Sequence, residues 1–86
     1  MTPPRRLSGP DPKYTLQALE HQVEGTMLVR CVLTVQGIVH DCHVLRSLPF
    51  MDRAVIEALE QRRYTPALEN GKPVEVAYVF VVKLRL

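Results

Sequence analysis

The last thirteen residues of the chain constrain its fold more tightly than any other segment. Residues 74–86 contain no proline or glycine, and every second position is apolar. A period of two is typical of a strand that buries one face. The pattern predicts one long strand, whose unpaired edge would be either an aggregation risk or a docking site. The apolar positions are Val74, Val76, Tyr78, Phe80, Val82, Leu84 and Leu86.

Composition excludes several classes of protein. The chain has 86 residues, 47% of them hydrophobic, which fits one folded domain and argues against disorder. Because the net charge is only +2 and the basic residues are scattered, we expect no nucleic-acid partner. No apolar run approaches the ~20 residues of a membrane span, and the first residues lack the apolar core of a signal peptide. A cytosolic protein and a piece of a longer chain both stay open.

Proline, glycine and charge divide the rest of the chain into elements. Residues 1–11 are rich in proline, which predicts the extended end of a linker before a domain over residues 12–86. Thr15 is the expected N-cap of the first helix, and a break in the alternation predicts a β-bulge at His40-Asp41. The expected elements are a short helix at 15–22, strands at 26–35 and 38–46, a helix at 51–63 and the final strand at 74–86.

The order of these elements predicts an α+β fold. A right-handed crossover from the hairpin through the long helix puts the third strand beside the first. We expect a three-stranded antiparallel sheet in the order 2-1-3, with the long crossover helix and the short N-terminal helix on one face. The final strand then lies at the edge of the sheet, with one side open.

Two cysteines face each other in the predicted hairpin. If Val35 lies opposite Ile38, paired positions sum to 73, which also pairs Cys31 with Cys42. Directly opposed residues have Cα atoms ~4.5 or ~5.5 Å apart, within disulfide range. A disulfide and a pair of reduced, buried cysteines remain alternatives.

The polar residues of the hairpin give no sign of a metal or catalytic site. His43 points to the opposite face from Cys42, so His40, Cys42 and His43 do not converge as metal ligands. Asp41, His43 and Ser47 lie on one short strand and its exit loop, without an oxyanion loop. We therefore expect no metal, no cofactor and no catalysis.

A series of short motifs carries a family resemblance. They are Pro12-x-Tyr14, Ala18, Gly25, Gly37, Asp52-x-Ala54-x-x-x-Ala58-Leu59, Arg63-Tyr64-x-Pro66-Ala67 and Gly71-x-Pro73-Val74. Their order and spacing resemble the C-terminal domain of TonB-family energy transducers over residues 12–86. Two positions depart from the family: Thr15 follows Tyr14 where the family often has proline, and Arg62 stands where it often has tryptophan. We interpret Arg62 either as a surface residue whose stem covers apolar area or as a partner contact.

The resemblance implies mechanical coupling without catalysis. In the family, an inner-membrane anchor and a proline-rich spacer carry this domain into the periplasm. There its last strand pairs with a short segment of an outer-membrane transporter. By this similarity we expect a membrane-anchored full-length protein and a peptide segment of an outer-membrane transporter or other envelope protein as partner. The expected partner contacts are Pro12, Tyr14, Val76, Ala77, Tyr78, Val79, Phe80, Val81 and Val82.

Two other hypotheses remain. One uses the same edge strand, and the other uses only the same arrangement of helices and strands. Two copies of the chain can pair through that edge, which gives a homodimeric structural module in another envelope machine, such as a motility or secretion complex. A cytosolic scaffold that shares only the arrangement of helices and strands is the third hypothesis.

Overall fold

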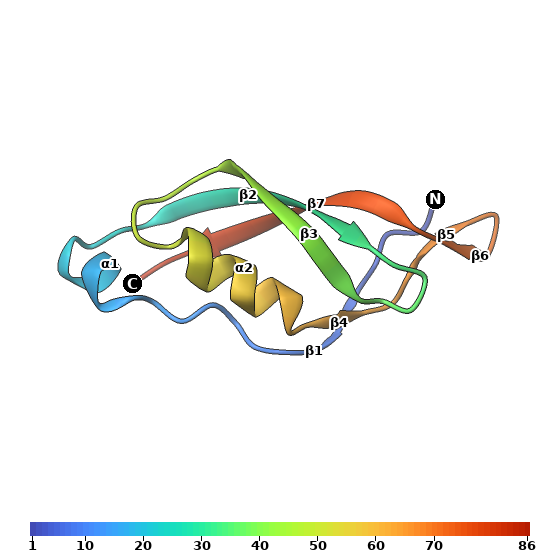
Figure 1. The fold of residues 1–86 in the computed structure, drawn as a ribbon, viewed down its shortest axis with the longest axis horizontal. Helices are drawn as coiled ribbons and strands as arrows, with labels where there is room; N and C mark the ends of the chain where they lie inside the picture. Colours follow the sequence, from blue (N-terminus) through green and yellow to red (C-terminus); the bar gives the residue numbers. More distant parts are fainter.

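Three antiparallel strands form the centre of the fold in this computed structural model, which describes residues 1–86 (Figure 1). The mixed α+β class expected from the sequence is confirmed. Neither helix has the length and apolar character needed to cross a membrane. In chain order the elements are β1 (Arg6–Ser8), α1 (Leu16–Glu20), β2 (Gly25–Leu33), β3 (Val39–Arg46), α2 (Asp52–Glu60), β4 (Arg63–Tyr64), β5 (Ala67–Glu69), β6 (Lys72–Val74) and β7 (Val76–Leu84).

The central sheet has the order β3-β2-β7. β2 and β7 pair without interruption from Gly25 opposite Leu84 to Leu33 opposite Val76. The final strand is shorter than the predicted 74–86, because Val74 pairs with Ala67 in the separate β5–β6 hairpin. Since β2 is its only neighbour, β7 has one free edge.

The core lies between this sheet and the helices. On β7, Phe80, Val82 and Leu84 are buried, whereas Val79 and Val81 on the opposite face are exposed. The period of two that predicted a half-buried strand is therefore confirmed. α2 and α1 contribute from one side of the sheet, and Thr15 caps α1 by accepting the Ala18 N–H at 3.1 Å. The most deeply buried large side chains are Met27, Leu33, Met51, Leu59, Val29, Val55 and Cys31.

The long helix ends earlier than the sequence suggested. We expected residues 51–63, but α2 covers Asp52–Glu60 and the chain then turns into β4. The Tyr64 N–H donates to the Gly37 carbonyl at 3.1 Å, which joins β4 to the turn of the β2–β3 hairpin. This long-range pairing outweighs the local preference for helix, so Arg62 and Arg63 do not lie in a last helical turn.

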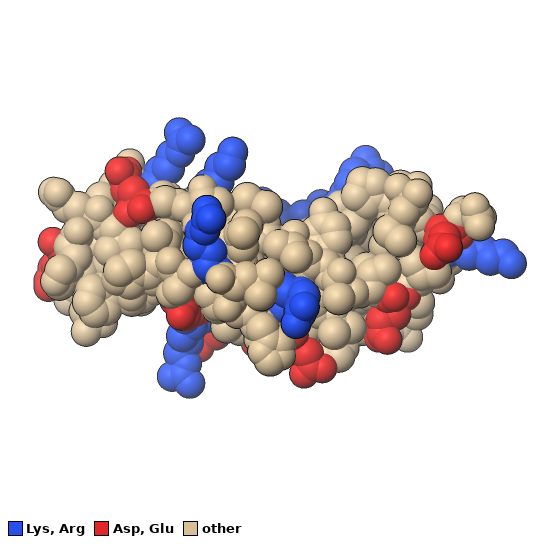
Figure 2. Space-filling view, turned by 90° about the horizontal axis from the view of Figure 1, so that it is seen from above, with Lys and Arg blue, Asp and Glu red and all other residues tan.

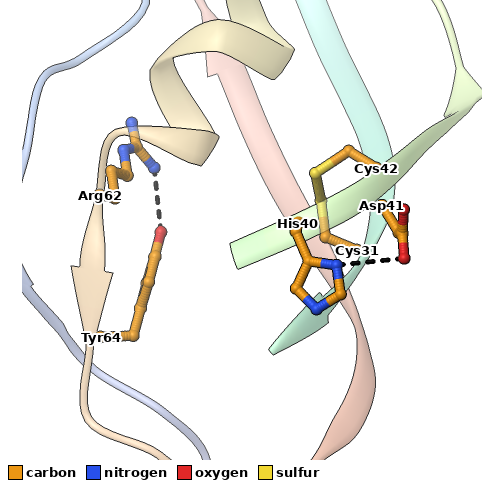
Figure 3. The surroundings of a disulfide bond; sticks show 6 residues. All are labelled: Cys31, His40, Asp41, Cys42, Arg62 and Tyr64. Atoms are coloured by element: carbon orange, nitrogen blue, oxygen red, sulfur yellow. Dashed lines mark hydrogen bonds and ion pairs between the residues drawn. A yellow bond between two sulfur atoms is a disulfide. The ribbon is translucent and has the colours of Figure 1, made fainter. Parts of the chain in front are cut away.

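The β2–β3 hairpin contains a bulge and a disulfide, which is shown in Figure 3. Arg30 pairs with His43 but Val32 pairs with His40, so Cys31 faces two residues, Asp41 and Cys42. The bulge is therefore one residue further along than predicted, and Asp41 takes a φ of 51°. Cys31 and Cys42 form a disulfide with Cα atoms 4.0 Å apart. Of the two states that the sequence left open, the structure holds the oxidised one.

The N-terminal stretch is extended, but it is not a free tail. It passes from the β5–β6 end, beside β4 and along the α2 side, to α1 (Figure 1). Thr2 and Leu68 exchange two backbone hydrogen bonds, of 2.8 and 3.1 Å, and β1 pairs with β4. We call residues 2–11 the strap, since they lie across elements that follow much later in the sequence.

Gly37 gives a test of the junction between the hairpin and β4. Its φ is +79°, and a Cβ atom there would collide with the Tyr64 carbonyl oxygen. We expect Gly37→Ala to lower the free energy of unfolding by about 2 kcal/mol or more, measured by urea denaturation. Gly71 has a similar φ of +77° with open space around it, so Gly71→Ala is the matched control and should cost less. Equal losses would contradict the close packing at Gly37.

The disulfide gives a second test. It closes a loop with a sequence separation of 11. For a loop of that length the chain-entropy account gives about 3 kcal/mol of stabilisation. Reducing the protein should lower the free energy of unfolding by that order in urea titrations. Two reactive thiols in the unfolded, unreduced protein would show instead that the bond is absent.

Candidate functional site

The free edge of β7 is the most regular unpaired edge in the molecule. Successive residues of an edge strand direct their backbone groups alternately toward the neighbouring strand and away from it. The groups directed away from β2 have no backbone partner in the protein. Such an edge can accept one more strand through main-chain hydrogen bonds.

The other outer edge of the sheet, on β3, is less suited to strand addition. Its pairing with β2 shifts register twice, between Arg30 and Val32 and between Leu28 and Val29. Bulges bend and twist a strand and leave residues unpaired, so another strand pairs less readily with such an edge. β7 has no such irregularity over its nine residues. The sheet thus has one open, regular edge.

The expected contact residues on β7 fall into three groups. Ala77, Val79 and Val81 lie on the outer face, where Val79 is 41% and Val81 59% exposed. Figure 2 views the molecule from above, the side away from α2, and much of that surface carries no charged side chain. The side chains of Phe80 and Val82 are in the core, so these residues can offer a partner only their backbone. The remaining two, Val76 and Tyr78, are half-buried and pack against the core.

A groove of about 500 Å³ lies beside the C-terminal half of β7. It brings Pro12 and Tyr14 next to Val81 and Val82, although these segments are far apart in the sequence. The other expected contacts, residues 76–80, lie outside this groove. Its lining residues are Asp11, Pro12, Tyr14, Arg62, Val81, Val82, Lys83, Leu84 and Arg85.

Tyr14 is fixed at the groove by its hydroxyl group. The hydroxyl donates to the Val23 carbonyl oxygen at 2.8 Å, and the ring packs against the core. Burial, followed by the nearby charge of Glu24, raises the pKa of Tyr14 above its ordinary value. The Tyr14 hydroxyl is therefore protonated at neutral pH, as its hydrogen bond to the Val23 carbonyl requires.

Arg62 has a buried, structural role beside the groove that the sequence did not predict. It is only 9% exposed, which corrects the interpretation of a surface side chain. Its Nε donates to the Pro10 carbonyl at 2.9 Å. Its Nη1 donates to the Tyr64 hydroxyl at 3.1 Å (Figure 3). Its Nη2 lies 3.6 Å from Oδ1 of Asp11. The only sign in the sequence that this position is unusual is a charged residue where the family often has tryptophan.

Asp11 is held between two arginines. Its Oδ1 accepts a hydrogen bond from Arg6 Nη1 at 2.8 Å and faces Arg62. The hydrogen bond and charge of Arg6, with a smaller contribution from Arg62, lower the pKa of Asp11. The carboxylate is therefore charged at neutral pH, and it links the strap to Arg62.

Comparison with known proteins identifies the family of the chain. Residues 10–85 match the family described as "Gram-negative bacterial TonB protein C-terminal". The solution NMR structure of the Pseudomonas aeruginosa TonB C-terminal domain is 29% identical in sequence, with a TM-score of 0.66. That alignment covers 94% of this chain and 86% of the Pseudomonas chain. A search of curated proteins finds no match. The chain therefore belongs to the family of TonB C-terminal domains.

Proposed function

We propose that this domain docks an extended peptide segment of an envelope protein by adding it as a fourth strand to the free edge of β7. The observation that carries the proposal is the uninterrupted pairing of β2 with β7, which leaves one regular edge open. The domain acts by binding and transmits force or energy without catalysis. Its place, by analogy with its family, is the periplasm.

The two faces of the sheet give the docked strand two environments. Side chains of an added strand alternate between the faces, as they do in any strand. On the outer face they would lie beside Ala77, Val79 and Val81, which are exposed. On the inner face, those next to Val82 would enter the groove bounded by Pro12 and Tyr14. Because main-chain hydrogen bonds supply much of the affinity, a partner of loose sequence with β-branched residues fits this edge.

The partner we propose is a short segment of an outer-membrane transporter. The family relation supports an outer-membrane or other envelope protein as the partner, and a membrane-anchored full-length protein belongs to the same proposal. A motility or secretion complex would use the same edge with a different peptide. All of these partners would use the same docking geometry, so a substitution in the edge of β7 tests that geometry for each of them.

Self-association is the second candidate function. Two copies could pair through the free edge of β7, and the exposed Val79 and Val81 would then lie together. Measuring the molecular mass across a range of protein concentrations separates the two functions. A monomer that changes size only when peptide is added supports docking, and a dimer that forms without peptide supports self-association.

A proline substitution tests the docking edge. Val79→Pro removes one N–H from β7 and disfavours pairing on both sides of the strand. We expect it to weaken peptide binding about tenfold or more. The binding partners to test are peptides tiled through the periplasm-facing segments of the outer-membrane transporters of the same bacterium. Calorimetry or fluorescence anisotropy gives the Kd.

The matched control is Val35→Pro. Val35 follows Thr34 in the hairpin turn, where the Gly37 N–H donates to the Thr34 carbonyl. Proline is favoured at this second position of a turn, so the variant should fold and bind normally. Circular dichroism and thermal melting establish that each variant is folded. A folded Val79→Pro domain with unchanged affinity would exclude this edge as the docking site.

A further inference from the structure

The strap touches the rest of the domain most closely at Gly9. This residue has a φ of +114°, and a Cβ atom there would lie 2.6 Å from Arg62 Cα and 2.7 Å from Arg62 Cγ. No side chain fits in that space without moving the strap or Arg62. The strap therefore crosses Arg62 at a distance that only glycine permits.

Arg62 connects this crossing point to the docking strand. Two of its three polar contacts, Pro10 and Asp11, belong to the strap, and the third is the Tyr64 hydroxyl. The ring of Tyr64 packs on that of Phe80, with centroids 5.0 Å apart, and Phe80 lies in β7. A continuous series of contacts thus runs from the strap through Arg62 and Tyr64 to β7.

The same crossing point fixes the wall of the groove. Pro12 follows the contact residues directly in the chain, and with Tyr14 it faces Val81 and Val82. The distant end of the strap is held independently, by the Thr2–Leu68 pair and by Arg5, whose N–H donates to Thr65 Oγ1 at 2.8 Å. Loss of the contacts at Arg62 would free the groove end of the strap while its other end stayed attached.

We propose that Gly9, Asp11 and Arg62 form a clamp that holds the end of the strap and thereby positions Pro12, which follows it, as part of one wall of the peptide-docking groove. Arg62 is then a positioning residue for the partner, although it need not touch it. This inference rests on the proposed docking function. Its consequence is that displacing the strap changes affinity for the partner without altering the edge of β7 itself.

Gly9→Ala tests the clamp, with Gly71→Ala as the matched control. Both glycines have positive φ, but Gly71 has open space around it. We expect Gly9→Ala to speed amide hydrogen exchange in residues 6–11 and to shift the NMR signals of Tyr14 and Val81. Because the groove is no longer pre-organised, peptide affinity should fall about fivefold. Gly71→Ala should leave exchange in the strap, the shifts and the Kd unchanged.

Two further variants separate positioning from general stability. Asp11→Ala removes an acceptor at the clamp and should weaken binding in the same direction as Gly9→Ala. Thr65→Val removes the acceptor of the Arg5 N–H at the far end of the strap, and should leave the Kd unchanged even if stability falls. If affinity follows the free energy of unfolding across all four variants, the clamp has only a structural role and the proposal is overturned.

The results also separate this inference from the docking function on which it rests. A wild-type domain that binds none of the tiled peptides overturns the docking function and, with it, the docking role of the clamp. A wild-type domain that binds peptide, with the same Kd in Gly9→Ala and Asp11→Ala, overturns the clamp alone. Weaker binding in both clamp variants, with normal binding in both controls, supports it.

Discussion

The uninterrupted pairing of β2 with β7 is the constraint on which the rest of the structure depends. It joins the two longest strands and fixes which side chains of β7 enter the core, since a slip of one residue would exchange the two faces. The buried face packs with α2, and the opposite face carries Val79 and Val81. Because β2 is already paired on both sides, the only regular free edge falls on β7.

The second organising feature is the N-terminal strap. Its pairing with β4 and β5 links residues from opposite ends of the sequence, and buried Arg62 holds the end that borders the groove. A charged side chain at low exposure needs partners for its donors. The strap supplies two acceptors, the backbone carbonyl of Pro10 and the side-chain carboxylate of Asp11. The strap and the free edge of β7 are thus parts of one arrangement around Arg62, Tyr64 and Phe80.

Much of this fold can be predicted from the sequence, because the patterns that indicate its main helix and strands lie within short segments of the chain. The alternation in residues 74–86 identified the buried face of β7, and the helix expected at residues 51–63 contains α2. The early end of α2 and the packing of the strap could not be predicted from the sequence. Both depend on contacts between residues that are far apart in the chain: Tyr64 with Gly37, and Arg62 with Pro10. The proline-rich composition of residues 1–11 predicted the extended end of a linker, but composition carries no information about the pairing of this segment with β4 and β5. Likewise, the exposure of Val79 followed from periodicity, whereas the burial of Arg62 did not.

The central claim is that a partner adds a strand to β7. Amide hydrogen exchange of the labelled domain, measured by NMR with and without a bound peptide, tests it most directly. The account predicts slower exchange at alternate residues of Val76–Leu84, those whose N–H groups face away from β2, and little change along β3. Protection that appears on β3 or on α2, with exchange on β7 unchanged, would contradict it.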